Sequence, residues 1–162
     1  MGNLKTFKQF LEAAVKQITV TFGRFQPPTI GHEKLLNAIA SEAAGGAYRI
    51  YVSQSVDPAK NPLQPTEKVK LMRKMFPKHA RNIIDDPSVK NVLNLATKVY
   101  DEGFTRLVLV VGEDRVQEFS KLLQKYQGKR MTDGYYDFPA GIEVISAGDR
   151  DPDSDDAVEG MS

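Results

Sequence analysis

The segment TFGRFQPPTIGHEKLL, residues 21–36, gathers side chains that can bind an anion at the start of a helix. Gly23 is followed by two prolines, and Gly31 and His32 stand where a helix is expected to begin. Thr29 lies three positions before His32, so both side chains should point to the same side of the helix start. Backbone N–H groups and the positive end of the helix dipole face that space. This pattern indicates a phosphate or another anion as the ligand.

The positions of the glycines show which known classes of phosphate site this segment does not match. Gly31 has no side chain, so a base or a phosphate can lie against the helix start, and Thr29 is expected to be the N-cap. The P-loop pattern G-x-x-x-x-G-K-[ST] does not occur in the chain. Gly23 and Gly31 are too far apart for the dinucleotide-binding pattern G-x-G-x-x-G. The expected site therefore belongs to neither of these two classes.

Strands alternate with helices along the chain, which predicts an α/β fold with a parallel sheet and right-handed crossovers. The expected strands are residues 18–22, 48–53, 82–86, 106–112 and 142–148. The expected helices are residues 30–44, 66–76, 88–103 and 114–126, with Thr66 and Ser88 as N-caps. Ligands of such sheets bind beyond the carboxyl ends of the strands, so the loops beginning at Gly23, Ser53 and Gly112 should form the site.

Composition excludes several classes of protein. The chain has 162 residues, of which 41% are hydrophobic, and this size predicts a single domain. Its formal net charge of +1 argues against a protein that coats nucleic acid or binds a membrane surface. It has no cysteine, which excludes disulfides, thiolate zinc sites and cysteine nucleophiles. No apolar run approaches the roughly 20 residues that span a bilayer, so we expect a cytoplasmic protein.

The two ends of the chain differ from the rest. Residues 1–16 have apolar positions at helical spacing and predict an amphipathic helix, which either packs on its own domain or serves as a docking arm. Residues 147–162 contain six acidic residues and one arginine, which is typical of a solvated acidic tail.

The segment GRFQPPTIGH, residues 23–32, resembles the first signature of the HIGH-type nucleotidylyltransferases, the cytidylyltransferase-like superfamily, in which a G-x-F-x-P loop precedes [HT]-x-G-H. Its GRFQP form is most similar to nicotinamide mononucleotide adenylyltransferases. KNPLQPTEKVKLMRKMF, residues 60–76, is similar to their N-P-[FL]-[ST]-x-x-E-[RK] segment, and VVGEDRV, residues 110–116, to their loop after the fourth strand. Ten consecutive positions of the first signature, at a strand-to-helix turn, make the resemblance specific.

The resemblance implies a Rossmann-like parallel sheet with helices on both faces, and transfer of a nucleotidyl group from a nucleoside triphosphate to a phosphorylated acceptor with release of pyrophosphate. ATP and nicotinamide mononucleotide are the expected pair, as in NAD biosynthesis. Transfer from CTP is the alternative. Mg²⁺ would be bound through the triphosphate, with no ligand from the protein. No membrane or nucleic acid partner is expected, and a homo-oligomer or a further C-terminal domain is left open.

The same resemblance implies roles for residues in several loops. His32 would stabilise the negative charge that develops on the phosphate oxygens, with the hydroxyl of Thr29 as a second catalytic donor. The nucleotide-binding set is Gly23, Arg24, Phe25, Gln26, Gly31, His32, Gly112, Glu113, Asp114, Arg115 and Ser162. The acceptor-binding set is Ser53, Lys60 and Asn61.

GMS, residues 160–162, looks like the start of the family's last signature, [IM]-S-[GST]-[ST]-x-x-R, so we expect a piece of a longer protein or a short, weakened member that serves as a nucleotide-binding or assembly module. Tyr135, Tyr136 and Phe138 are expected to close the core rather than stack on the acceptor, and His79 to lie on the surface. A class I aminoacyl-tRNA synthetase, which has a similar H-I-G-H segment, is disfavoured because the chain is short and has no K-M-S-K-S.

Overall fold

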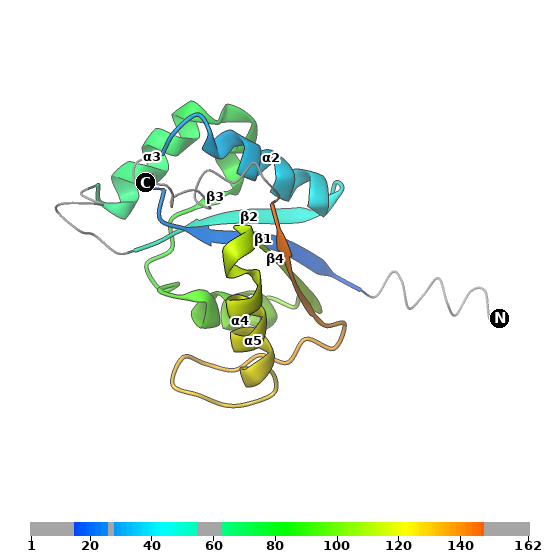
Figure 1. The fold of residues 1–162 in the computed structure, drawn as a ribbon. Helices are drawn as coiled ribbons and strands as arrows, with labels where there is room; N and C mark the ends of the chain where they lie inside the picture. Colours follow the sequence, from blue (N-terminus) through cyan, green and yellow to red (C-terminus); the bar gives the residue numbers. More distant parts are fainter. Residues whose placement is uncertain (1–14, 26–27, 55–62, 148–162) are drawn as a thin grey trace.

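The computed structural model describes residues 15–25, 28–54 and 63–147, in which strands and helices alternate (Figure 1). The strands are β1 (Gln17–Gly23), β2 (Ala47–Val52), β3 (Ile83–Ile84), β4 (Arg106–Val111) and β5 (Ile142–Ser146). The α-helices are α2 (His32–Ala43), α3 (Pro65–Met75), α4 (Val92–Asp101) and α5 (Val116–Tyr126). Two 3₁₀ helices, η1 (Pro77–Asn82) and η2 (Glu113–Arg115), precede β3 and α5.

The strands form one parallel sheet in the order β3-β2-β1-β4-β5. The chain moves outward from β1 through β2 to β3, then returns to the other side of β1 for β4 and β5. Helices α2 and α3 cover one face of the sheet, and α4 and α5 cover the other (Figure 1). The Rossmann-like α/β fold expected from the sequence is therefore confirmed.

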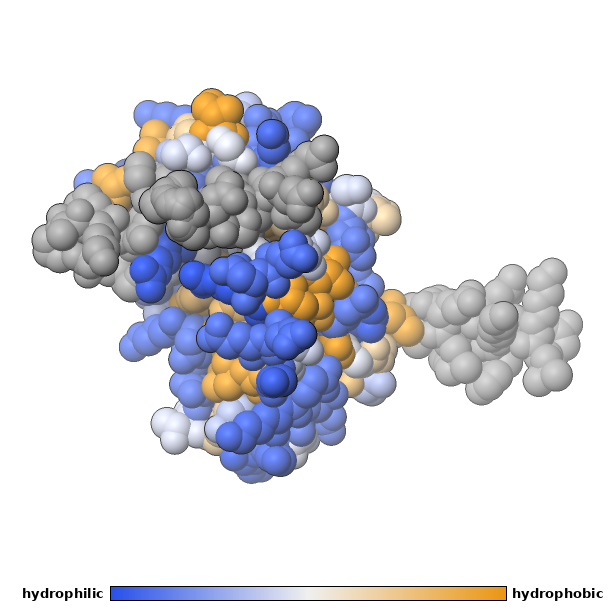
Figure 2. All heavy atoms as spheres, viewed as in Figure 1, coloured by the Kyte–Doolittle hydropathy of each residue, from blue (hydrophilic) through white to orange (hydrophobic). Residues whose placement is uncertain are grey.

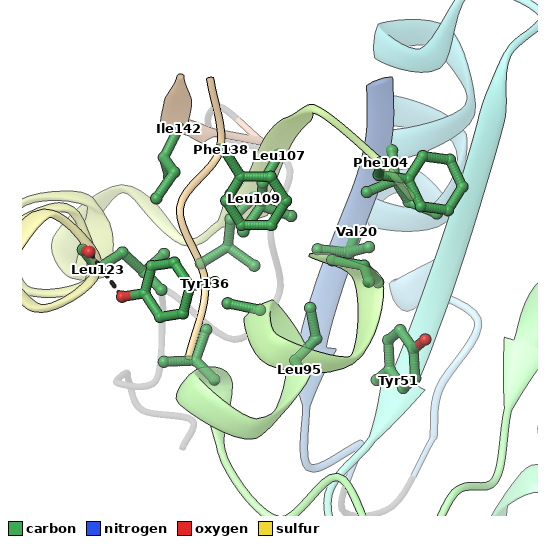
Figure 3. Close-up of a cluster of buried hydrophobic side chains, with 14 of the residues drawn as sticks. Val20, Tyr51, Leu95, Phe104, Leu107, Leu109, Leu123, Tyr136, Phe138 and Ile142 are labelled. Atoms are coloured by element: carbon green, nitrogen blue, oxygen red, sulfur yellow. Dashed lines mark hydrogen bonds between the residues drawn. The ribbon is translucent and has the colours of Figure 1, made fainter. Parts of the chain in front are cut away.

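The sheet lies between two hydrophobic clusters, and β2 and β4 each contribute side chains to both. The α4/α5 cluster includes Val20, Leu95, Leu107, Leu109 and Leu123 (Figure 3). The α2/α3 cluster includes Phe25, Leu36, Val69, Val108 and Val110. Successive residues of β4 alternate between the two clusters because successive side chains of a strand point to opposite faces. This explains why β4 is a nearly continuous apolar run, as expected for a strand covered on both faces.

The irregular segment after α5 closes the α4/α5 cluster. Tyr136 and Phe138 are almost fully buried in it, and the Tyr136 hydroxyl donates a 2.6 Å hydrogen bond to the carbonyl oxygen of Leu123 (Figure 3). Burial raises the pKa of the Tyr136 phenol above its ordinary value. Tyr135 is half-buried, with its ring against that of Tyr100. The prediction that this aromatic group closes the core is confirmed for Tyr136 and Phe138.

The three N-caps predicted from the sequence, Thr29, Thr66 and Ser88, are not the caps that the structure shows. Helix α2 begins at His32 with Gly31 as its N-cap, so Thr29 is not the cap. Helix α4 begins at Val92 and is capped by Asn91, whose side-chain oxygen accepts a 2.8 Å bond from the amide of Asn94.

Helix α3 is capped by Gln64, and the predicted caps Ser88 and Thr66 make polar contacts of another kind. Ser88 lies in the turn before α4, where its amide and hydroxyl donate to the carboxylate of Asp86 at 2.9 and 2.6 Å. Thr66 lies within α3, and its hydroxyl donates to Asp85 at 3.0 Å. A hydroxyl near a helix start can either cap the helix or bond to another nearby acceptor. Here the carboxylates of Asp86 and Asp85 accept these hydroxyls, so neither residue caps its helix.

His79 was expected on the surface, and this prediction is wrong. It is 3% exposed in η1, between α2 and β2. Its Nε2–H donates to the side-chain oxygen of Asn37, and its Nδ1 accepts from the hydroxyl of Tyr48, both at 2.8 Å. Burial and the neighbouring Lys78 lower the pKa of His79 below its ordinary value.

The surface of the described residues is mostly hydrophilic on the face shown in Figure 2, with apolar side chains visible between the charged ones. The large apolar side chains with substantial exposure are Val15, Ile30 and Leu71. No helix within the described ranges is long and apolar enough to cross a membrane. The expected N-terminal helix and acidic tail fall almost entirely on residues 1–14 and 148–162, outside the described residues.

The end of α2 offers a test of local backbone strain. Ala44 follows the helix at φ 50° and ψ 47°, a left-handed conformation that an L-residue other than glycine rarely adopts. We expect Ala44→Gly to raise the free energy of unfolding by about 0.5–1 kcal/mol, measured by urea denaturation. Ala38→Gly, inside the same helix, is the matched control and should lower it by about 1 kcal/mol. A loss of stability in both variants would contradict the strain at Ala44.

Candidate functional site

The sheet separates between β1 and β4 at their carboxyl ends. These two strands are paired only as far as Val20 opposite Leu109. Beyond this point β1 stays paired with β2 as far as Gly23, and β4 with β5 as far as Val111. The order β3-β2-β1-β4-β5 also changes direction between β1 and β4. The carboxyl end of such a switch point is the usual ligand site of an open α/β sheet.

The loop after β1 has an unusual backbone conformation at Phe25. This residue has a φ of 49°, although its side chain is bulky and it is 1% exposed. Its ring packs in the α2/α3 cluster and meets the imidazole of His32 edge-on, with ring centroids 5.0 Å apart. A Cβ atom on Gly23 would lie 3.1 Å from the Phe25 ring, so a glycine makes room for it. Strained conformations of this kind cluster at binding and catalytic sites.

Thr29 determines which nitrogen of His32 carries the proton. The backbone N–H of Thr29 donates to Nδ1 of His32 at 2.9 Å, and the Thr29 hydroxyl lies 3.1 Å from the same atom. Because Nδ1 accepts a hydrogen bond, it has no proton, and Nε2–H is the donor of the ring. The expectation that Thr29 and His32 lie on the same side of the helix start is confirmed.

The backbone amides at the start of α2 are less available than the sequence suggested. The N–H groups of residues 32–34 donate to the carbonyl oxygens of residues 29–31 at 2.9–3.3 Å. The N–H of Thr29 is engaged with His32. The amides of residues 32–34 belong to the first three residues of α2, and their acceptors belong to the turn that leads into the helix. An anion at this site would therefore depend more on side chains, such as His32 and the exposed Arg24, than on these amides.

The loop after β4 provides the other side of the switch point. Gly112 is buried, and the amide of Arg115 donates to its carbonyl oxygen at 2.9 Å. Glu113, Asp114 and Arg115 form η2 with their side chains exposed, and α5 starts only at Val116. The four sequence-predicted residues of this loop thus lie at the edge of the sheet where β1 and β4 separate.

A family model described as cytidylyltransferase-like matches residues 20–145. The match runs from β1 to β5 and includes both loops of the switch point. The chain belongs to the cytidylyltransferase-like family. Membership of this family indicates nucleotidyl transfer as the general activity. Comparison with curated proteins and with solved structures finds no significant match.

The acceptor-binding residues predicted for this cytidylyltransferase-like chain are described only in part. Ser53 follows β2, is 7% exposed, and donates its amide N–H to the carbonyl oxygen of Gly23 at 2.7 Å. It therefore lies beside the loop that leads to His32. Four other predicted site residues lie outside the described residues, namely Gln26, Lys60, Asn61 and Ser162.

Sequence reasoning missed a polar group at the ends of β2 and β3. The carboxylate of Asp85 accepts from the hydroxyl of Thr66 at 3.0 Å and lies 3.5 Å from the side-chain nitrogen of Gln54. The three residues come from separate segments of the family fold, so no spacing in the sequence could identify the group. Within the described ranges, no group of three or more His, Asp or Glu residues could hold a metal ion.

Lys68 is a further residue of this region to which sequence reasoning gave no role. It lies in α3, is fully buried, and donates from its ammonium group to the backbone carbonyl oxygen of Arg24. Burial, together with the charge of Arg24, lowers the pKa of Lys68 to about 8, so the side chain is still largely protonated at neutral pH. A signal was present, because Lys68 stands four positions before the buried Met72, on the apolar face of the helix.

Proposed function

We propose that this chain transfers a nucleotidyl group from a nucleoside triphosphate to a phosphorylated acceptor. The observation that carries the proposal is the contact of Thr29 with His32, which makes Nε2–H the donor of an imidazole at the switch point of a cytidylyltransferase-like fold. A phosphate oxygen of the acceptor attacks the α-phosphorus. The bond from that phosphorus to the α–β bridging oxygen breaks, and pyrophosphate leaves with the electron pair.

This reaction needs positioning and charge stabilisation rather than a protein nucleophile. In the proposal, His32 donates from Nε2 to a phosphate oxygen that gains negative charge, and the hydroxyl of Thr29 is a second donor. The exposed guanidinium of Arg24 attracts the polyphosphate. Mg²⁺ binds through the triphosphate oxygens, a ligand set that suits this ion, and neutralises part of their charge.

We assign the nucleotide base and ribose to the loop after β4, residues 112–115, because this loop follows the carboxyl end of the strand on the other side of the switch point from β1. Ser53 stands on the β2 side of Gly23, which supports an acceptor site there. Lys60 and Asn61, outside the described residues, remain proposed acceptor contacts by family resemblance. ATP and nicotinamide mononucleotide are the proposed pair. CTP is the alternative nucleotide.

The test is pyrophosphate release by the full chain with Mg²⁺. ATP and CTP are each offered with nicotinamide mononucleotide, phosphorylated sugars and phosphorylated alcohols as acceptors. We expect turnover with ATP and nicotinamide mononucleotide, and little with CTP. Turnover with CTP alone would replace the proposed substrates but keep the reaction. No pyrophosphate from any pair would contradict the reaction itself.

A nucleotide-binding or assembly module without turnover is the second candidate. It is favoured by the first amides of α2, which are engaged with carbonyl oxygens and leave fewer donors for a triphosphate. Calorimetry with ATP and Mg²⁺ separates the two candidates when it is combined with the turnover assay. Binding that is weakened in His32→Ala, without turnover in the unmodified chain, would support the module.

A further inference from the structure

Lys68 is an unusual residue for the interior of a protein. It is fully buried in α3, beside Val69 and Met72, which belong to the α2/α3 cluster. Removing an ammonium group from water is costly unless the group finds a strong partner. The partner here is the neutral carbonyl oxygen of Arg24, 44 positions earlier in the chain. A neutral carbonyl group compensates little of the desolvation cost of an ammonium group, so this contact contributes little to the stability of the core. What the contact does fix is the position of the Arg24 carbonyl group.

The carbonyl group of Arg24 belongs to the peptide that precedes Phe25. The φ angle of Phe25 is the rotation between this peptide and the rest of the residue, and its value of 49° is strained. A strained angle persists only where both sides of the bond are held. Lys68 holds the peptide on one side, and burial of the Phe25 ring holds the other. The hydrogen bond from Lys68 and the burial of the ring together stabilise the left-handed conformation of Phe25.

The conformation of Phe25 in turn affects His32. The two rings meet edge-on at 66°, with centroids 5.0 Å apart. If Phe25 relaxed to a negative φ, its ring would leave this contact, and the imidazole would lose the wall against which it packs. We propose that Lys68 is a positioning residue, which fixes the peptide between Arg24 and Phe25 and thereby holds the His32 imidazole in place.

The consequence of this positioning for catalysis rests on the proposed function, whereas its structural part can be tested alone. The lowered pKa of Lys68 agrees with its burial, and the remaining positive charge lies beneath a loop assigned to a polyphosphate. A Phe25 side chain and an imidazole that are already in place need no reordering when the triphosphate binds, which favours both affinity and rate.

The structural test uses the ring signals of the two histidines in ¹H–¹³C correlation spectra of the full chain. Lys68→Met keeps an unbranched apolar side chain but removes the donor. We expect it to shift the His32 signals, because the ring current of Phe25 changes, and to leave those of His79 unchanged. Lys70→Met is the matched control, since Lys70 is exposed on the same helix, and it should change neither histidine.

Lys68→Arg retains a donor and a charge, so it should keep the His32 signals close to those of the unmodified chain. If Lys68→Met does not fold, Lys68→Gln replaces it, because its shorter side chain loses the same hydrogen bond. Unchanged His32 signals in a folded Lys68→Met or Lys68→Gln would overturn the proposal. Failure of both variants to fold would also overturn it, since Lys68 would then be a residue of stability alone.

The functional test is the affinity for ATP and Mg²⁺ by calorimetry. We expect Lys68→Met to weaken binding by about 10- to 100-fold, while Lys70→Met stays within about twofold. If the unmodified chain binds no nucleotide, the proposed function fails, and the histidine signals still decide the role of Lys68. If Lys68→Met binds ATP as tightly as the unmodified chain while its His32 signals shift, the positioning of His32 does not affect nucleotide binding. The functional part of the proposal is then overturned.

Discussion

His32→Ala should lower the rate of pyrophosphate release by about 10²- to 10³-fold, the usual cost of removing one donor that stabilises charge in a transition state. The reason is the arrangement of the imidazole, in which Thr29 occupies Nδ1 and leaves Nε2–H as the donor. The measurement is a pyrophosphate assay with kcat and KM determined separately. Most of the loss should appear in kcat, because the bond strengthens as charge develops.

Two variants serve as controls for this prediction. Thr29→Val removes the hydroxyl but keeps the backbone N–H that contacts Nδ1, so its loss should be smaller, about tenfold. His79→Gln changes the other histidine, which is bonded to Tyr48 near the amino end of β2, away from the switch point. It should lower stability and leave the turnover of the folded protein unchanged. If His32→Ala and His79→Gln lowered the rate of pyrophosphate release equally, the loss in His32→Ala would not come from a catalytic role of His32.

Gly134→Ala is expected to lower the free energy of unfolding by about 2–4 kcal/mol. Gly134 has a φ of 129°, which strains any residue with a side chain. An added Cβ would also lie 2.4, 2.7 and 2.9 Å from the Oγ1, Cγ2 and Cβ atoms of Thr97 in α4. Both the segment after α5 and the helix are packed on the α4/α5 cluster, so neither can move aside easily. Urea denaturation followed by circular dichroism measures the loss, since the chain has no tryptophan.

Gly45→Ala separates backbone strain from the clash. Gly45 has a φ of 88°, but nothing lies within 4 Å of an added Cβ, so only strain of about 1 kcal/mol is expected. Thr97→Ala removes two of the three clashing atoms, and the hydroxyl it deletes is buried and has no hydrogen-bond partner among the described residues. It should therefore cost little alone and recover part of the stability lost in Gly134→Ala. Additive losses in the double variant would contradict the clash.

The sequence predicted the order of strands and helices well, but not where the helices begin. Ser88 and Asn91 are both good N-cap residues, and the local pattern does not choose between them. In the structure the carboxylate of Asp86 accepts both the amide and the hydroxyl of Ser88, so Asn91 caps α4. The choice depends on a hydrogen bond in the preceding turn, which competes with helix capping.

Buried polar residues were the main failure of sequence reasoning at the candidate site and around it. His79 and Lys68 were not recognised because their partners are distant in the chain, with Asn37 lying 42 positions from His79 and Arg24 lying 44 positions from Lys68. A single polar residue gives no periodic signal of its own, and most lysines are exposed. Only packing of α3 and η1 against the sheet brings these groups to their acceptors.

The sequence by itself determined the parallel α/β architecture, since alternating apolar strands and amphipathic helices leave few other ways to bury their apolar faces. It also determined the placing of Thr29 beside His32, because residues three positions apart at a helix start share one side. The tertiary structure decided the strained conformation of Phe25 and the burial of Lys68. These features depend on hydrogen bonds and packing between distant segments, and such contacts exist only once the sheet has formed.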